Sequence, residues 1–129
     1  MPPAPNFLYF SYIIKNISKH NTMKKVLVTG GFGLVGQGIK NISLAYKSKY
    51  QFIFVKSSDY DLSSMEQTKE MFSTILPDYV IHLAACVGGL FKNMNYKVDM
   101  LERNIMINYN VVKCCHSYNV QDQKNLQEK

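Results

Sequence analysis

The sequence predicts an α/β protein in which three parallel strands are flanked by helices. Short runs rich in β-branched and aromatic residues alternate with longer segments whose apolar residues recur every three or four positions. Strands and helices that alternate in this way form right-handed βαβ units, which produce a parallel sheet. Only three such strands are predicted, so we expect the carboxyl-terminal half of the domain to be absent.

The composition is ordinary for one globular domain. The chain has 129 residues, of which 47% are hydrophobic and 19% charged. No apolar run approaches the roughly 18 residues of a membrane span, so no membrane partner is expected. The three cysteines, Cys86, Cys114 and Cys115, are too few and too badly spaced for a disulfide framework. This favours a reducing, cytoplasmic setting.

The basic charge does not indicate nucleic-acid binding. The formal net charge is +6, but the 15 Lys and Arg residues are spread along the chain, and Arg103 is the only arginine. Nucleic-acid surfaces require clustered basic residues. We interpret these lysines as solvated side chains and expect no nucleic-acid partner.

The two ends differ in composition from the middle of the chain. Residues 1–22 open with three prolines and an aromatic run, and we expect a disordered extension, or translation from a start upstream of Met23. The positive charges follow the apolar run, which disfavours a targeting peptide. Residues 121–129 are polar apart from Leu126 and predict a tail or a frayed helix end. Residues 23–120 should therefore carry the fold.

The first strand–helix unit lies directly after Met23. Residues 26–29 (VLVT) form a short run typical of a buried parallel strand. A glycine-rich turn follows at residues 30–36, and apolar residues at helical spacing continue through residues 39–45. Residues 51–55 (QFIFV) predict the second strand.

The remaining elements follow in the same alternation. Residues 61–64 (DLSS) predict a helix amino-terminal cap, because each serine has a Glu or Gln three residues later. The helix that follows has one apolar face and should end before Pro77. Residues 79–85 (YVIHLAA) predict the third strand, and residues 98–118 predict a long helix.

The glycine spacing predicts a partial Rossmann fold that binds a dinucleotide. Gly30 should allow a tight turn out of the strand, Gly33 a close approach of the backbone to a pyrophosphate, and Gly36 close packing of the helix. The helix amino terminus then offers free N–H groups and a positive dipole end to phosphate. The alternative is a plain strand–turn–helix connection.

The end of the second strand favours NADP over NAD. NAD sites place a carboxylate there to bind the ribose hydroxyls, but residues 55–58 contain none and the nearest is Asp59. Lys56, with the hydroxyls of Ser57 and Ser58, suits a 2′-phosphate instead. The alternative is a solvent-exposed lysine.

The positions of the histidines and cysteines predict neither a catalytic site nor a metal site. His82 lies in an apolar strand, where a packed, hydrogen-bonded histidine is favoured over a catalytic one. Cys115 and His116 have no second ligand pair at zinc-like spacing. Cys86 follows the third strand and could either line a site or be a small buried residue.

Two segments resemble a known enzyme family. Residues 28–36 (VTGGFGLVG) resemble the TGGxGxxG signature of extended short-chain dehydrogenases/reductases. Residues 80–93 (VIHLAACVGGLFKN) resemble the more specific VIHLAAxVGGLFxN segment of the GDP-L-fucose synthase family, which are NADPH-dependent epimerase–reductases of GDP-4-keto-6-deoxy-D-mannose.

The resemblance implies roles for individual residues. The pyrophosphate of NADP would lie against Gly30, Gly31, Phe32, Gly33, Leu34, Val35 and Gly36. Asp61 and Leu62 would meet the adenine. The cofactor ribose and nicotinamide would lie along Ala84, Ala85 and Val87, and the border of the GDP-sugar site would be formed by Val87, Gly88, Gly89 and Leu90.

The chain also departs from the family pattern. The family continues into a strand with a catalytic Ser and then a Tyr-x-x-x-Lys pair, and neither follows here. Tyr109 and Lys113 have the spacing, but they lie within the predicted long helix and we interpret them as a coincidence. We therefore expect a truncated form, inactive alone, with no catalytic residue.

Two alternatives to this interpretation remain. The chain could be a non-catalytic NADP-binding or dimerisation module that pairs with the full-length enzyme, because related reductases form homodimers through the helix that matches residues 98–118. It could also be another nucleotide-sugar epimerase or dehydratase of the extended family, although the loop at residues 87–89 disfavours this.

Overall fold

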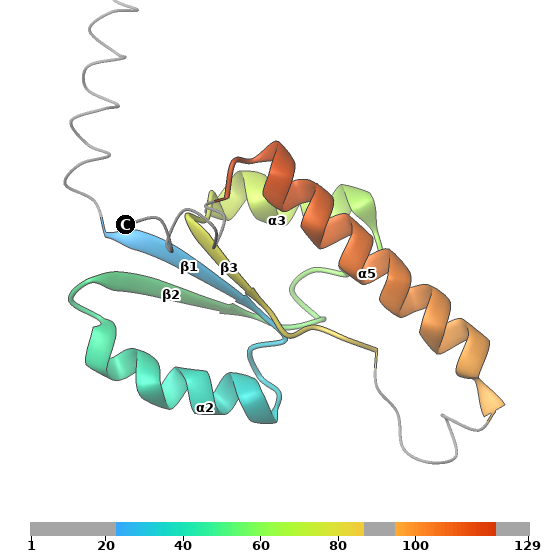
Figure 1. Ribbon diagram of the computed structural model, residues 1–129, viewed down its shortest axis with the longest axis horizontal. Helices are drawn as coiled ribbons and strands as arrows, with labels where there is room; N and C mark the ends of the chain where they lie inside the picture. The colour runs from blue at the N-terminus through green and yellow to red at the C-terminus, as the bar shows by residue number, and fades with distance from the viewer. Residues whose placement is uncertain (1–22, 87–94, 121–129) are drawn as a thin grey trace, which may run out of the picture.

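The computed structural model describes residues 23–86 and 95–120, and its elements form three layers (Figure 1). One side of the sheet is covered by α2, and the other by α3 and α5. The elements, in chain order, are β1 (Lys24–Thr29), α2 (Leu34–Ser43), the 3₁₀ turn η1 (Leu44–Tyr46), β2 (Tyr50–Val55), α3 (Met65–Ile75), β3 (Tyr79–His82) and α5 (Lys97–Ser117). The expectations for residues 1–22, 87–90 and 121–129 lie outside the described residues.

The sheet has the predicted parallel topology. Its strand order is β2-β1-β3, so β1 is central. Thr29, the last residue of β1, pairs in register with Val55 of β2 and with His82 of β3. The three strands therefore end at the same level, and their carboxyl ends form one edge. Ligand sites of open α/β sheets lie outside this edge.

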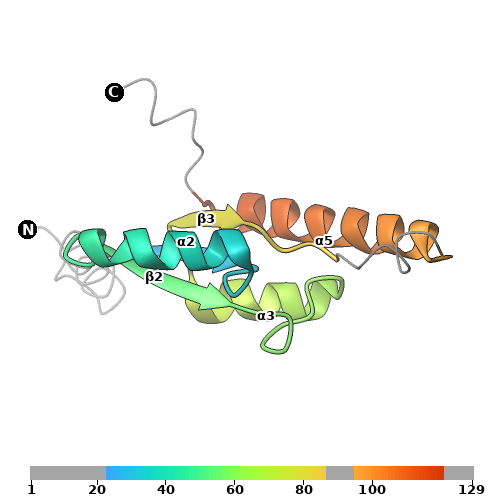
Figure 2. The same cartoon turned by 90° about the horizontal axis from the view of Figure 1, so that it is seen from below.

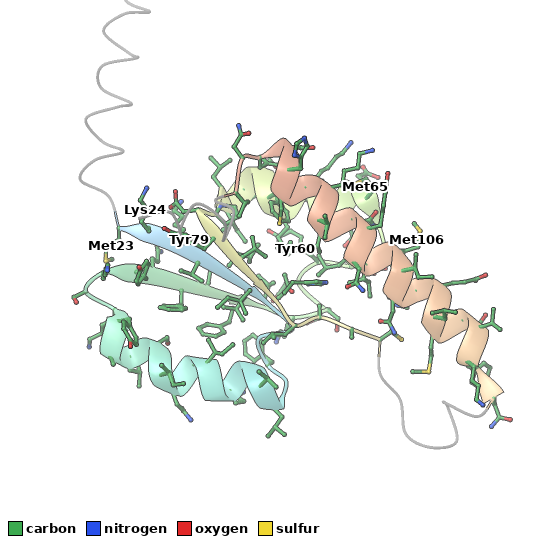
Figure 3. All side chains as sticks on the ribbon, in the orientation of Figure 1. Met23, Lys24, Tyr60, Met65, Tyr79 and Met106 are labelled. Atoms are coloured by element: carbon green, nitrogen blue, oxygen red, sulfur yellow. The ribbon has the colours of Figure 1, made fainter. Side chains whose placement is uncertain are left out.

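The core lies on the side of the sheet that faces α3 and α5. Leu27 of β1 and Phe72 of α3 are fully buried there, together with Val111 of α5. Burial of each such side chain stabilises the fold by about 1.5–3 kcal/mol. Figure 3 labels Tyr60 and Met65, two partly buried side chains that pack against this core. Sheet and helices are thus joined by one apolar cluster.

The cap of α3 forms as predicted, with one change of partner. Ser64 is the N-cap and its hydroxyl accepts a hydrogen bond from the Gln67 backbone N–H at 3.3 Å. The Gln67 side chain does not return to Ser64: its Oε1 accepts from the Asp61 backbone N–H at 2.9 Å. The two hydrogen bonds of Gln67 therefore hold both the helix terminus and the loop before the helix.

The turn between α3 and β3 is attached to the start of β1. The Asp78 backbone N–H donates to the Lys25 carbonyl at 2.9 Å, and the Lys25 N–H donates to the Asp78 carboxylate at 2.8 Å. Leu76 terminates α3 in the left-handed conformation, with φ 49°. Pro77 follows at once and prevents a longer helix.

The third strand is shorter than predicted. β3 ends at His82, and residues 83–85 continue without ladder pairing. The reason is that β1 ends at Thr29: the Leu83 N–H still donates to the Thr29 carbonyl at 3.1 Å, but the chain of β1 then turns away. The two alanines that follow are thereby freed to line the edge of the sheet.

The predicted apolar face of the first helix is not buried. Only Gly36 and Ser43 are buried in α2, while Ile42 and Leu44 are 63% and 67% exposed. The helix ends at Ser43 and continues as the 3₁₀ turn, earlier than the apolar spacing suggested. Among the described residues α2 is the sole helix on its side of the sheet (Figure 1), so no neighbouring helix covers this face.

The long helix α5 extends past the sheet. Both Figure 1 and Figure 2 show its amino-terminal half beyond the strands. Its buried residues are Ile107, Asn110, Val111 and Cys114, all in the carboxyl-terminal half. Met106, labelled in Figure 3, is 46% exposed.

The packing of α2 makes a testable prediction at two glycines. A Cβ on Gly36 would lie 2.4 Å from the backbone carbonyl of Gly31, whereas a Cβ on Gly38 meets nothing within 4 Å. We expect Gly36→Ala to lower the free energy of unfolding by about 2 kcal/mol. Gly38→Ala should raise it by up to about 1 kcal/mol, because alanine favours the helix. Equal urea midpoints for the two variants would contradict this packing.

Candidate cofactor-binding site

A cavity of about 480 Å³ opens at the carboxyl edge of the sheet. It is bounded by the turn after β1, the loop after β2, the chain after β3 and one face of α5. Its lining residues are Gly30, Phe32, Gly33, Val55, Lys56, Ser57, Tyr60, Asp61, Leu62, Leu83, Ala84, Ala85, Cys86, Arg103 and Ile107. The cavity is therefore where the topology of an open α/β sheet predicts a ligand.

The turn at Gly30 requires glycine for two reasons. Its φ is +65°, in the left-handed region, and a Cβ there would lie 2.7 Å from the Ala84 backbone nitrogen. The next residue is also fixed, since the Gly31 N–H donates to the Val55 carbonyl at 3.1 Å. The turn after β1 is thus held between the ends of both neighbouring strands.

Internal packing requires glycine at Gly36 but not at Gly33. A Cβ on Gly33 would be 3.5 Å from the Gly30 carbonyl oxygen, an ordinary contact, so internal packing does not require glycine there. Gly36 packs on the backbone of Gly31, so this glycine brings the helix against the turn rather than against a strand. The role predicted for Gly33, a close approach by phosphate, stays a prediction.

The amino terminus of α2 is open. Its N-cap is Gly33, which has no capping side chain, and its first turn contains no acidic residue. The α3 terminus in the same chain has both, in Ser64 and Glu66. The first N–H groups of a helix have no intrahelical partner and carry partial positive charge. The α2 terminus can therefore accept a phosphate group.

Positive side chains gather around Phe32 at one end of the cavity. The Nζ of Lys56 lies 5.2 Å from the centroid of the Phe32 ring, and the Nζ of Lys40 lies 5.6 Å from it. Asp59 is the nearest carboxylate in sequence, but its Oδ2 accepts the Lys56 backbone N–H at 2.9 Å and it does not line the cavity. This end of the cavity therefore favours an anion.

Asp61 and Arg103 face each other at the cavity wall. Hydrogen bonds from the Ser63 hydroxyl and backbone N–H lower the pKa of Asp61, and the nearby Arg103 guanidinium, 3.1 Å away, lowers it further, against the effect of burial. The carboxylate is therefore ionised at neutral pH and can accept hydrogen bonds from a ligand.

The carboxyl end of β3 is fixed by side-chain amides of α5. The Asn104 Oδ1 accepts the Cys86 backbone N–H at 2.6 Å, and its Nδ2 donates to the Cys86 carbonyl at 3.0 Å. His82 lies between Thr29 Oγ1, at 2.6 Å, and Asn108 Oδ1, at 2.9 Å. The hydrogen bonds predicted for His82 are present, and the residue is half-buried.

The structure brings most of the predicted cofactor residues together. Nine of them line the cavity: Gly30, Phe32, Gly33, Lys56, Ser57, Asp61, Leu62, Ala84 and Ala85. Gly31 and Gly36 lie behind the turn and are buried, while Leu34 and Val35 are exposed on α2. Val87, Gly88, Gly89 and Leu90 lie outside the described residues.

Five lining residues were not assigned a role in the site from sequence: Val55, Tyr60, Leu83, Arg103 and Ile107. The spacing of α5 contained a signal for two of them, since Arg103 lies one helical turn before Ile107, and Ile107 begins the buried face of the helix. No sequence pattern indicated that Tyr60 would line the cavity, because its position depends on the conformation of the loop after β2.

The described residues contain no grouped metal ligands, and burial keeps one of their thiols protonated. Within residues 23–86 and 95–120, no three His, Cys, Asp or Glu side chains are close enough to hold a metal ion. Burial, together with the adjacent Cys114, raises the pKa of Cys115 to about 11, so this thiol stays protonated at neutral pH. None of the helices in these residues has the length and apolar character needed to cross a bilayer.

The Tyr109–Lys113 pair lies away from the cavity. The Lys113 Nζ donates to the Tyr109 hydroxyl at 3.1 Å, and both side chains are on the exposed part of α5. Neither lines the cavity. The interpretation of the pair as a coincidence of spacing stays a prediction.

Comparison with known proteins places these features in one family. A sequence model of the NAD dependent epimerase/dehydratase family matches residues 26–127. The GDP-L-fucose synthase of Dictyostelium discoideum is 50% identical over 105 residues, covering 81% of this chain and 33% of the relative. A probable GDP-L-fucose synthase of Drosophila melanogaster is 46% identical over 95 residues, covering 73% and 30%.

A solved structure agrees with these relatives. The crystal structure of a GDP-L-fucose synthetase from Naegleria fowleri bound to NADP is similar with a TM-score of 0.69 and 43% identity, covering 75% of this chain and 31% of that one. The chain thus spans about a third of the length of the proteins it matches. With a parallel sheet, a glycine turn and a family match over most of its residues, the chain belongs to the NAD dependent epimerase/dehydratase family.

Proposed function

We propose that the cavity binds NADP and that the chain is the cofactor-binding part of a GDP-L-fucose synthase. Such an enzyme converts GDP-4-keto-6-deoxy-D-mannose to GDP-L-fucose by epimerisation and NADPH-dependent reduction. The observation that carries the cofactor proposal is the uncapped, acid-free α2 terminus at the cavity that Lys56 lines. The GDP-L-fucose synthases among its relatives support the reaction. When bound, the cofactor supplies hydride.

The residues of the cavity fit the parts of the cofactor in sequence. The pyrophosphate would lie at the turn of residues 30–36, against the open helix terminus. Asp61 and Leu62 would border the adenine, together with Arg103, which pairs with Asp61. Ala84 and Ala85 would lie along the ribose and nicotinamide, because small side chains leave the edge of the sheet accessible.

The 2′-phosphate is assigned to the cluster around Phe32. Lys56 lines the cavity with Ser57, and Lys40 approaches the same ring from α2. Two ammonium groups and a hydroxyl match a dianionic phosphate, whereas a bare ribose would gain little from them. Lys40 was not among the residues predicted from sequence.

The substrate and the proton donor are not assigned to described residues. Reduction requires that cofactor, ketone and acid be held together. Tyr60 lines the cavity but is followed four residues later by Ser64 and not by Lys, so the cavity lining described here contains no Tyr-x-x-x-Lys pair, and we therefore propose that the chain is inactive alone. The free thiols of Cys86, Cys114 and Cys115 support a reducing, cytoplasmic location.

A second candidate function is pairing with another copy of the fold. The apolar side chains of α5 that are exposed form a row at intervals of three and four residues: Val98, Leu101, Ile105, Tyr109 and Val112. A helix with such a face normally buries it against a partner. A homodimer through α5, or a pair with a full-length family member, would cover this row.

Cofactor choice can be tested by thermal denaturation of the full chain. We expect NADPH to raise the melting temperature more than the same concentration of NADH, because only NADPH has a phosphate for the cluster at Phe32. An equal shift, or no shift with either, would refute the NADP assignment.

The cluster itself can be tested by substitution. Lys56→Ala and Lys40→Ala should each weaken NADPH binding by about 3- to 10-fold, the size of one charge-assisted contact at a solvated site. Binding of NADH should change by less than twofold in both. Lys47→Ala is a matched control, since Lys47 lies after α2 and does not line the cavity. Isothermal titration calorimetry measures the affinities of the wild type and the three variants for both cofactors, and an equal loss for both cofactors would contradict the assignment.

The pairing role of α5 can be tested on its apolar row. Ile105→Lys should convert a dimer to a monomer in size-exclusion chromatography with light scattering, because it places a charge inside the interface. Glu102→Lys, at an exposed position outside the row, should leave the dimer intact. A pull-down with an intact family member tests the mixed pair. A monomeric wild-type chain that also fails the pull-down would refute this function.

A further inference from the structure

A buried hydroxyl connects the glycine turn to β3. Thr29 is fully buried and directly precedes Gly30. Its Oγ1 accepts the backbone N–H groups of Leu83 at 3.2 Å and Ala84 at 3.4 Å. The same oxygen lies 2.6 Å from Nδ1 of His82. One side chain thus contacts three consecutive residues at the end of β3.

The directions of these hydrogen bonds follow from the number of donors. Because two N–H groups donate to Thr29 Oγ1, its own hydrogen is left to donate to His82 Nδ1. The proton of the neutral imidazole is then on Nε2, which donates to Asn108 Oδ1 at 2.9 Å. A single tautomer of His82 therefore satisfies every hydrogen bond in the series that links β1 to α5.

These hydrogen bonds hold the segment after β3 at the point where it comes closest to the turn after β1. Gly30 is so close to β3 that a Cβ would lie 2.7 Å from the Ala84 nitrogen. A change in the rotamer of Thr29 would release the Ala84 N–H and let the end of β3 move relative to Gly30. His82 itself does not line the cavity, so any influence on a ligand passes through Thr29.

We propose that His82 is a positioning residue for the phosphate-binding turn. By accepting the Thr29 hydroxyl hydrogen at Nδ1, it fixes the rotamer that holds Ala84 against Gly30 and sets the affinity of the cavity for NADP. Asn108 orients the ring from α5. The inference rests on the proposed cofactor binding and adds a residue that acts without touching the cofactor.

The test measures NADPH affinity and stability together in the full chain. His82→Phe keeps an aromatic ring but has no acceptor, and Thr29→Val keeps the shape but has no hydroxyl. Each should weaken NADPH binding about tenfold, as expected from the loss of one buried hydrogen bond. His82→Asn and Thr29→Ser, which retain an acceptor and a hydroxyl, should recover most of the affinity. If His82→Phe and Thr29→Val do not fold, the NADPH affinities of His82→Asn and Thr29→Ser are measured in their place.

A matched control separates positioning from general loss of stability. Val80 lies on the same strand and packs against the core, but it takes no part in the hydrogen bonds that join Thr29, His82 and Asn108. Val80→Ala should lower the melting temperature while leaving the NADPH affinity within twofold. If affinity follows melting temperature alone across all variants, including Val80→Ala, His82 is merely structural and the proposal is overturned.

A spectroscopic measurement tests the hydrogen bonds without the cofactor. Nitrogen-15 NMR of the imidazole should show the Nε2–H tautomer in the wild-type chain and a mixture of tautomers in Thr29→Val. The opposite tautomer in the wild type would overturn the proposal while leaving the NADP assignment intact. Failure of the wild type to bind NADPH, with the expected tautomer present, would refute the proposed function and with it the positioning role.

Discussion

The near-contact of two backbones at the carboxyl edge of the sheet is the constraint on which the rest of the structure depends. The chain leaves β1 at Gly30 with φ +65° and passes so close to Ala84 that no side chain fits between them. This approach closes one side of the cavity and leads the chain into α2, whose N-cap residue, Gly33, lines the cavity. Thr29, Gly31 and Gly36 all act to hold that turn, through a hydroxyl, a backbone hydrogen bond and a missing Cβ respectively.

The two sides of the sheet differ in how completely they are packed. Leu27, Phe72 and Val111 join β1, α3 and α5 in one buried cluster. On the other side, α2 buries only Gly36 and Ser43, and aromatic rings of β2 cover part of the sheet by stacking on one another, as Phe52 and Phe54 do. Stability therefore comes mainly from the α3–α5 side, while the α2 side is organised around the glycine turn after β1.

Much of the fold could be predicted from sequence because it depends on local patterns. The strands at VLVT and QFIFV, the capped α3 and the long α5 follow directly from apolar spacing and capping residues. The end of β3 could not be predicted, because it depends on where its partner β1 stops. The exposure of Ile42 could not either, since apolar spacing shows which face would be buried and not whether anything covers it. In the site, the glycines and Lys56 were visible in sequence, whereas Lys40 and Tyr60 enter only through tertiary packing.

The central claim is that the turn after β1 binds the phosphates of NADP. The most direct measurement is a titration of the nitrogen-15-labelled chain with NADPH, followed by amide chemical shifts. The account predicts the largest shifts at the backbone N–H groups of residues 33–36, at the open end of α2, with further shifts at Lys56 and Ser57. Shifts confined to the exposed face of α5, or none at saturating NADPH, would contradict it.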